Sequence, residues 1–98
     1  MRLNTEEIAA IETSFAETFG KGEVFLFGSR TDDRRRGGDI DLYVVPETRT
    51  DLTRKKIDFL VGFKRRIGEQ KIDVVIDRGN ARPIDTIARK TGVLLCRR

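Results

Sequence analysis

The sequence has no histidine, no tryptophan and only one cysteine among its 98 residues. The absence of histidine excludes a Ser-His or Cys-His nucleophilic apparatus and every histidine-ligated metal site. A single cysteine excludes an internal disulfide and a cysteine-rich zinc site. Three possibilities remain: carboxylate–metal chemistry, phosphate binding by glycines and cations, or no chemistry at all.

Long apolar runs are also missing. The longest uncharged apolar run is far shorter than the ~18 residues that a membrane-spanning helix needs, so we expect no membrane association. Glu6 and Glu7 stand where a signal peptide would have its apolar segment. We therefore expect a cytoplasmic protein in which Cys96 is reduced and lies buried in a strand.

Charge, by contrast, is abundant and unevenly distributed. Charged residues make up 37% of the chain, and the net charge is +4. Residues 1–49 hold 7 basic and 10 acidic side chains, whereas residues 50–98 hold 13 basic and 6 acidic ones. The basic half is typical of a solvated, highly charged surface. It is also compatible with a face that binds phosphates or an acidic partner.

The spacing of apolar residues predicts alternating helices and strands. Asn4 and Glu7 have the spacing of a capping box at the start of the first helix. Helical periodicity, period-two alternation and the glycines and prolines between them predict helices over 5–19, 51–67 and 83–91, and strands over 23–27, 39–45, 71–77 and 93–96. This order favours a single domain over residues 1–98, of the α/β (α+β) class, with a small mixed sheet of about four strands covered by helices.

The same periodicities predict which side chains face the core. On the second strand, Ile40, Leu42 and Val44 share one face, and Asp39, Asp41 and Tyr43 share the other. In the helices, the residues expected to point inward are Ile8, Ile11, Phe15, Phe19, Leu52, Leu60, Phe63, Ile67, Ile84 and Ile87. The outer face of the helix over 51–67 is expected to carry Arg54, Lys55, Lys56, Lys64, Arg65 and Arg66.

The segment with chemical potential begins directly after the first strand. Gly28 allows backbone N–H groups to approach a phosphate closely, and the Ser29 hydroxyl is able to donate to one of its oxygens. A Gly-Ser turn alone is usually no more than a turn, and this pair is weak evidence by itself.

Three aspartates strengthen the signal. Asp39 and Asp41 are two residues apart on a strand, so both carboxylates leave the same face. A divalent cation such as Mg²⁺, which prefers oxygen ligands, would relieve their repulsion. Standing alone, the pair is also compatible with a solvent-facing strand. Asp73 joins the pair if its strand lies beside theirs, while Asp77, near the end of the same strand, is expected on the surface.

Together, Gly28-Ser29, the Asp39-Ile40-Asp41-Leu42 segment and the strand carrying Asp73 resemble the polymerase-β-type nucleotidyltransferase superfamily. The short chain is most similar to its minimal members, the antitoxins found beside HEPN-domain toxins. The resemblance covers residues 20–77 in motifs and nearly the whole chain in the order of elements.

The resemblance implies a Mg²⁺-dependent enzyme with one or two metal ions. Asp39, Asp41 and Asp73 would bind the metal, with Asp73 as the base, and Gly28 and Ser29 would hold the NTP triphosphate. The family's minimal members imply transfer of AMP from ATP to a tyrosine of a HEPN toxin. The helical domain with which larger relatives bind their acceptor is absent, so a partner protein or a homo-oligomer is expected to supply that function.

Other residues and other functions remain open. Arg30 either contacts phosphate or forms a surface ion pair, and Arg34–Arg36 form either a solvated loop tip or a contact to an acidic partner or RNA. Tyr43 flanks the carboxylates. Two other functions are a non-catalytic antitoxin that occludes its partner, and a nucleic-acid-binding protein using the basic half. The latter is not expected, because no aromatics are interleaved with the basic residues and no binding motif is present.

Overall fold

A four-stranded sheet lies at the centre of the protein, with strand order β3-β2-β1-β4. The computed structural model describes residues 3–27, 40–68, 71–79 and 82–98. Within them, the elements are α1 (Thr5–Thr18), β1 (Gly22–Phe27), β2 (Ile40–Pro46), α2 (Leu52–Ile67), β3 (Ile72–Ile76), α3 (Pro83–Thr91) and β4 (Val93–Arg97). The predicted helices, strands and fold class are confirmed, and no boundary differs by more than one residue.

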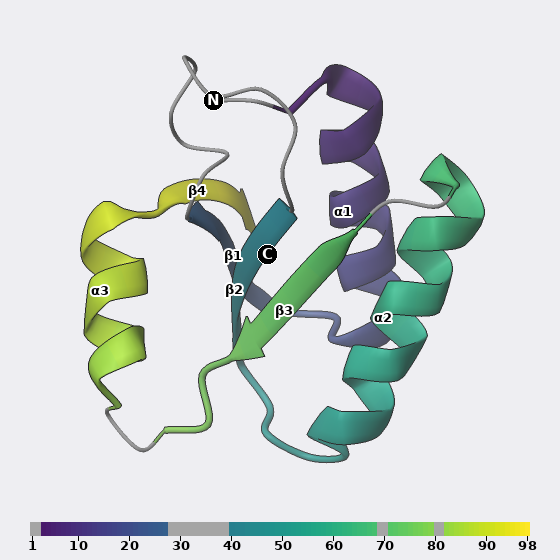
Figure 1. Ribbon diagram of the computed structural model, residues 1–98. Helices are drawn as coiled ribbons and strands as arrows, with labels where there is room; N and C mark the ends of the chain where they lie inside the picture. The colour runs from purple at the N-terminus through teal and green to yellow at the C-terminus, as the bar shows by residue number, and fades with distance from the viewer. Residues whose placement is uncertain (1–2, 28–39, 69–70, 80–81) are drawn as a thin grey trace.

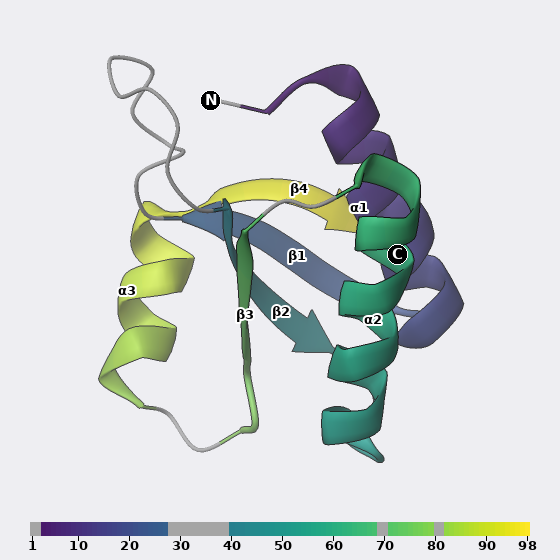
Figure 2. The ribbon, with the colours of Figure 1, turned by 45° about the vertical axis from the view of Figure 1, so that its right-hand side comes forward.

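The sheet is mixed. Strand β1 pairs antiparallel with both β2 and β4, whereas β2 and β3 are parallel. Parallel neighbours cannot be joined by a tight turn, so the chain needs a crossover, and α2 provides it. Helices α1 and α2 cover one face of the sheet and α3 lies on the other (Figures 1 and 2).

The hydrophobic core lies between the sheet and the α1–α2 layer. As predicted, Ile40, Leu42 and Val44 of β2 are fully buried. They pack in one cluster with the apolar positions of β1 and β3 and with residues of both helices, among them Phe15 and Phe63. Alternation along β2 therefore directs its apolar side chains to this core and Asp41 to the face that carries α3.

One buried helix residue was missed, and one assignment of an inward-facing residue was wrong. Phe59, which was not among the predicted core residues of α2, is fully buried. Ile87, expected to face the sheet, has 55% of its surface exposed. Among the side chains of α3 that the structure describes, Asp85 and Ala88 are buried instead. Asp85 takes the position that faces the sheet because Arg82, the residue before the helix, binds its carboxylate.

The N-terminus of α1 forms the predicted capping box. The Asn4 side chain accepts a hydrogen bond from the Glu7 N–H at 2.7 Å, and the Glu7 carboxylate accepts one from the Asn4 N–H at 3.0 Å. Two of the four N–H groups that begin a helix without partners are thereby satisfied.

Helix α3 is held to the sheet by Arg82, the residue that precedes it. The Asp85 carboxylate accepts hydrogen bonds from the Arg82 backbone N–H at 2.7 Å and from its guanidinium at 3.1 Å. The same guanidinium donates to the carbonyl oxygen of Ile76, at the end of β3, at 2.6 Å. The hydrogen bond from Arg82 lowers the pKa of Asp85, and the hydroxyl of the buried Tyr43 acts in the same direction.

Gly22, the first residue of β1, is required by its backbone conformation and by its neighbours. Its φ is +137°, a region that other residues rarely adopt, and a Cβ at this position would collide with the carbonyl oxygen of Val45. We expect Gly22→Ala to lower the free energy of unfolding by about 1–3 kcal/mol, measured by urea denaturation. Gly20 also has a positive φ, but a Cβ at that position would meet no atom within 4 Å, so Gly20→Ala is the matched control. An equal loss in both variants would show that the collision is unimportant.

The Arg82–Asp85 anchor makes a pH-dependent contribution to stability. Because the pKa of Asp85 is lowered in the folded protein, the stabilisation is complete above the unfolded-state pKa of about 3.9. It is lost as the pH falls through the folded-state pKa. We expect Asp85→Asn to lower Tm at pH 7, and the difference from wild type to shrink below about pH 4. Thermal unfolding followed by circular dichroism at both pH values tests this, and a difference independent of pH would contradict it.

Candidate functional site

The structure describes some of the residues predicted to form a site, and the others lie outside the described ranges. Asp41 lies in β2 and Asp73 in β3, and the structure describes both. Gly28, Ser29, Arg30, Asp39 and the Arg34–Arg36 segment lie outside the described residues. The geometry of the site therefore begins with two of the three predicted carboxylates.

Strands β2 and β3 place these two aspartates side by side. In their parallel pairing, Asp41 is the register partner of Asp73. Neighbouring strands lie about 4.8 Å apart, and side chains at paired positions leave the same face of a sheet. The condition set by the sequence, that the strand of Asp73 lie beside that of Asp41, is met.

Local packing explains why the register is held. Ile40 and Ile72 are register partners and are both buried, and so are the next inward-facing partners, Leu42 and Val74. The Ile40 N–H also donates to the carbonyl oxygen of Lys71 at 3.0 Å, which extends the ladder one residue before β3. A slip of one residue would turn Asp73 into the core, so burial of the apolar partners also aligns the carboxylates.

The carboxylates lie in a setting that favours a cation. Asp41 is half-buried and Asp73 is exposed, on the face opposite the α1–α2 layer. Like charges at directly paired positions of a sheet destabilise it. Oxygen donors in this arrangement suit a hard divalent cation such as Mg²⁺. Within the described ranges no cluster of three or more potential metal ligands is found, and Asp39, the third predicted ligand, lies outside those ranges.

Lys71 was not singled out from the sequence. It lies two residues before Asp73, and therefore on the same side of the chain, and it is exposed. The alternation that places Asp73 on the outer face of its strand also places Lys71 there, so the sequence could have identified this lysine. Its place makes it the described cation nearest in sequence to Asp73.

Two other polar residues associated with this face have structural roles. Tyr43, two residues after Asp41, is fully buried, and its ring packs against that of Phe25 at a centroid distance of 6.2 Å. Asp77 was expected on the surface, and this was wrong: only 6% of it is exposed. Its carboxylate accepts a hydrogen bond from the Gly79 N–H at 2.7 Å and faces the Arg49 guanidinium at 3.6 Å.

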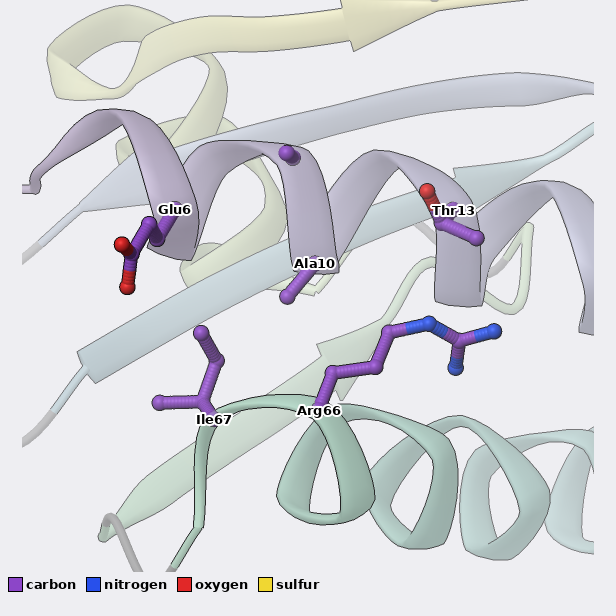
Figure 3. A pocket seen from close by; sticks show the side chains of 6 residues that line it. Glu6, Ala10, Thr13, Arg66 and Ile67 are labelled. Atoms are coloured by element: carbon purple, nitrogen blue, oxygen red, sulfur yellow. The ribbon is translucent and has the colours of Figure 1, made fainter.

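Hollows on the described surface also occur away from the carboxylates. One of about 310 Å³ lies between α1 and the end of α2, lined by Glu6, Ala9, Ala10, Thr13, Arg66 and Ile67 (Figure 3). It is on the opposite side of the sheet from Asp41 and Asp73. Its lining contains no pair of carboxylates, so it does not continue the candidate site.

Comparison with known protein families gives a match. A family model described as a nucleotidyltransferase domain matches residues 8–93, which is most of the chain. No curated protein matches the sequence. None of the described helices is long and apolar enough to cross a membrane. The match includes both described carboxylates and the strands that align them, and the chain belongs to the nucleotidyltransferase domain family.

Proposed function

We propose that this nucleotidyltransferase transfers AMP from ATP to a hydroxyl group, in a reaction that depends on Mg²⁺. Family membership supports nucleotidyl transfer in general. The observation that carries the proposal is the register pairing of Asp41 with Asp73, which brings two strand-borne carboxylates to one point on the sheet. The choice of AMP and ATP rests on the resemblance to minimal nucleotidyltransferases.

In this proposal, Asp39, Asp41 and Asp73 hold the divalent cation. When bound, the cation neutralises the triphosphate and the charge that develops during transfer. Gly28 and Ser29 bind the triphosphate through backbone N–H groups and the hydroxyl, with Arg30 beside them.

The transfer itself is an in-line displacement. The acceptor oxygen forms a bond to the α-phosphorus as the bond to the bridging oxygen breaks, and pyrophosphate leaves. The proton of the acceptor hydroxyl passes to Asp73. The exposure of Asp73 supports this role, because an acceptor carried by another molecule has to reach the base.

We further propose that the acceptor is a tyrosine of a HEPN toxin in the cytoplasm, and that the protein acts as its antitoxin. This part rests on the resemblance in motif and length. The fold is consistent with it, because the described helices all pack on the sheet and none extends from it as a separate acceptor-binding unit (Figures 1 and 2).

The carboxylates are tested by replacing them. We expect Asp41→Asn or Asp73→Asn to reduce nucleotide transfer by about 10²-fold or more, measured with α-labelled ATP and a purified HEPN toxin as the proposed acceptor. Asp58→Asn is the matched control, since Asp58 is exposed on α2. Unchanged transfer in both site variants would refute the assignment.

The same variants separate catalysis from occlusion. If modification of the toxin is responsible for its neutralisation, co-expression with Asp41→Asn leaves the toxin active, and replacing the acceptor tyrosine of the toxin by Phe abolishes labelling. Neutralisation that survives loss of both carboxylates would instead show that the protein acts by binding alone.

Cation binding has a readout that does not depend on activity. A ligand that binds only the folded state raises Tm in proportion to RT ln(1 + [L]/Kd). We expect Mg²⁺ or Mn²⁺ alone to raise the Tm of the wild type, and Asp41→Asn/Asp73→Asn to abolish the increase. An undiminished shift in the double variant would contradict the predicted ligands.

A further inference from the structure

The outer face of α2 exposes two β-branched apolar residues. Ile57 and Val61 have 55% and 49% of their surfaces exposed and lie one helical turn apart. They project away from Phe59 and Phe63, which anchor the helix in the core. β-Branched residues are mediocre helix formers, so an exposed helix position gains nothing from them unless another surface covers them.

The two helices of this layer carry opposite charges. Helix α1 contains four glutamates and no basic residue. Helix α2 contains six basic residues and one aspartate. A single ion pair, Arg66–Glu17 at 2.8 Å, joins the two helices within the described chain. In the ranges that the structure describes, Glu6, Glu12, Lys64 and Arg65 form no ion pair, and all four are exposed.

The surface between the helices is hollowed. Beside the hollow of Figure 3, a second one of about 400 Å³ is lined by Glu17, Thr18, Asp58, Val61, Gly62, Arg65 and Arg66. These linings show that the helices run antiparallel, with Glu6 near Ile67 and Glu17 near Asp58. The layer therefore offers a groove with an apolar ridge on one side and acidic side chains on the other.

We propose that the outer face of α1 and α2 is the interface of a homodimer. A second copy fits this face, because the face carries both an acidic helix, α1, and a basic helix, α2. A two-fold axis parallel to the helices, running along the groove, places each α2 against the α1 of the other copy. Rotation about this axis does not shift residues along the helix direction, so each residue faces those at the same level in the other copy. Lys64 and Arg65 then lie at the level of Glu6 and Glu12 of the second copy, and Val61 lies over its α1.

The extent of the face indicates a modest affinity. At 1.5 Å per residue the two helices are about 21 and 24 Å long. With a spacing of about 8–10 Å between them, they present an area at the lower end of what specific interfaces bury. The dimer therefore forms in a concentration-dependent way and weakens as salt screens the charges.

The other exposed apolar group is less suited to self-association. Val93 and Leu94 lie on β4, at the edge of the sheet. The pairing of β4 with β1 contains a register irregularity, and the charged Arg97 ends the strand. Irregular registers and charges are features that prevent edge-to-edge pairing.

The interface leaves the candidate site open, because Asp41 and Asp73 lie on the opposite face of the sheet. Failure of the proposed dimer would therefore leave nucleotidyl transfer untouched, and failure of transfer would leave the dimer untouched.

Sedimentation velocity over a concentration series up to about 1 mM tests the proposal with the protein alone. We expect the wild type to dimerise, and Val61→Glu to raise the dimer Kd at least tenfold. Ile87→Glu is the matched control, since Ile87 is similarly exposed but lies on α3. A wild type that stays monomeric, or equal weakening by both variants, would overturn the proposal.

A charge exchange gives the decisive second measurement. In Lys64→Glu/Arg65→Glu and in Glu6→Lys/Glu12→Lys, facing charges become alike, so each variant alone should be monomeric. Mixed one to one, they restore opposite charges at both contacts and should form a heterodimer. Circular dichroism establishes that both variants fold. Absence of the heterodimer from the mixture would refute the two-fold arrangement.

Discussion

The parallel pairing of β2 with β3 is the constraint on which the remaining structure depends. Because these strands run in the same direction, the chain must cross over between them, and α2 is that crossover. The crossover lies on the same face as α1, so the two helices bury the apolar side of the sheet together (Figure 2). The same pairing brings Asp41 and Asp73 together, and one set of backbone hydrogen bonds thus determines both the fold and the candidate site.

Along β2 and β3, the residues that stabilise the sheet alternate with the carboxylates of the candidate site. Ile40, Leu42 and their partners on β3 stabilise the register by burial, while the intervening Asp41 and Asp73 contribute mutual repulsion. At roughly 1.5–3 kcal/mol for each fully buried aliphatic side chain, burial outweighs the repulsion of an incompletely buried pair.

Most of the fold could be predicted because its signals are local. The capping box of Asn4 and Glu7 and the alternation along β2 depend only on neighbouring residues, and both are confirmed. The errors arose where a distant partner decides burial. Asp77 is buried because Arg49, 28 positions earlier, meets it, and Ile87 is exposed because Asp85, bound by Arg82, takes the inward position. The local sequence also could not predict that Asp41 and Asp73 lie side by side, since strand order is a property of the whole sheet. Only the resemblance to a known family suggested it.

The hydrogen bonds that anchor α3 connect this helix to the strands that carry the candidate site. Arg82 joins Asp85 to the end of β3, and the hydroxyl of Tyr43 helps to keep that carboxylate ionised. Tyr43 and Asp41 share a face of β2, two residues apart. Helix α3 therefore covers the sheet over Tyr43, while Asp73, at the start of β3, remains exposed. In the proposed reaction an acceptor carried by another molecule has to reach that carboxylate, so the position at which α3 is anchored would determine how much of this face the acceptor can approach.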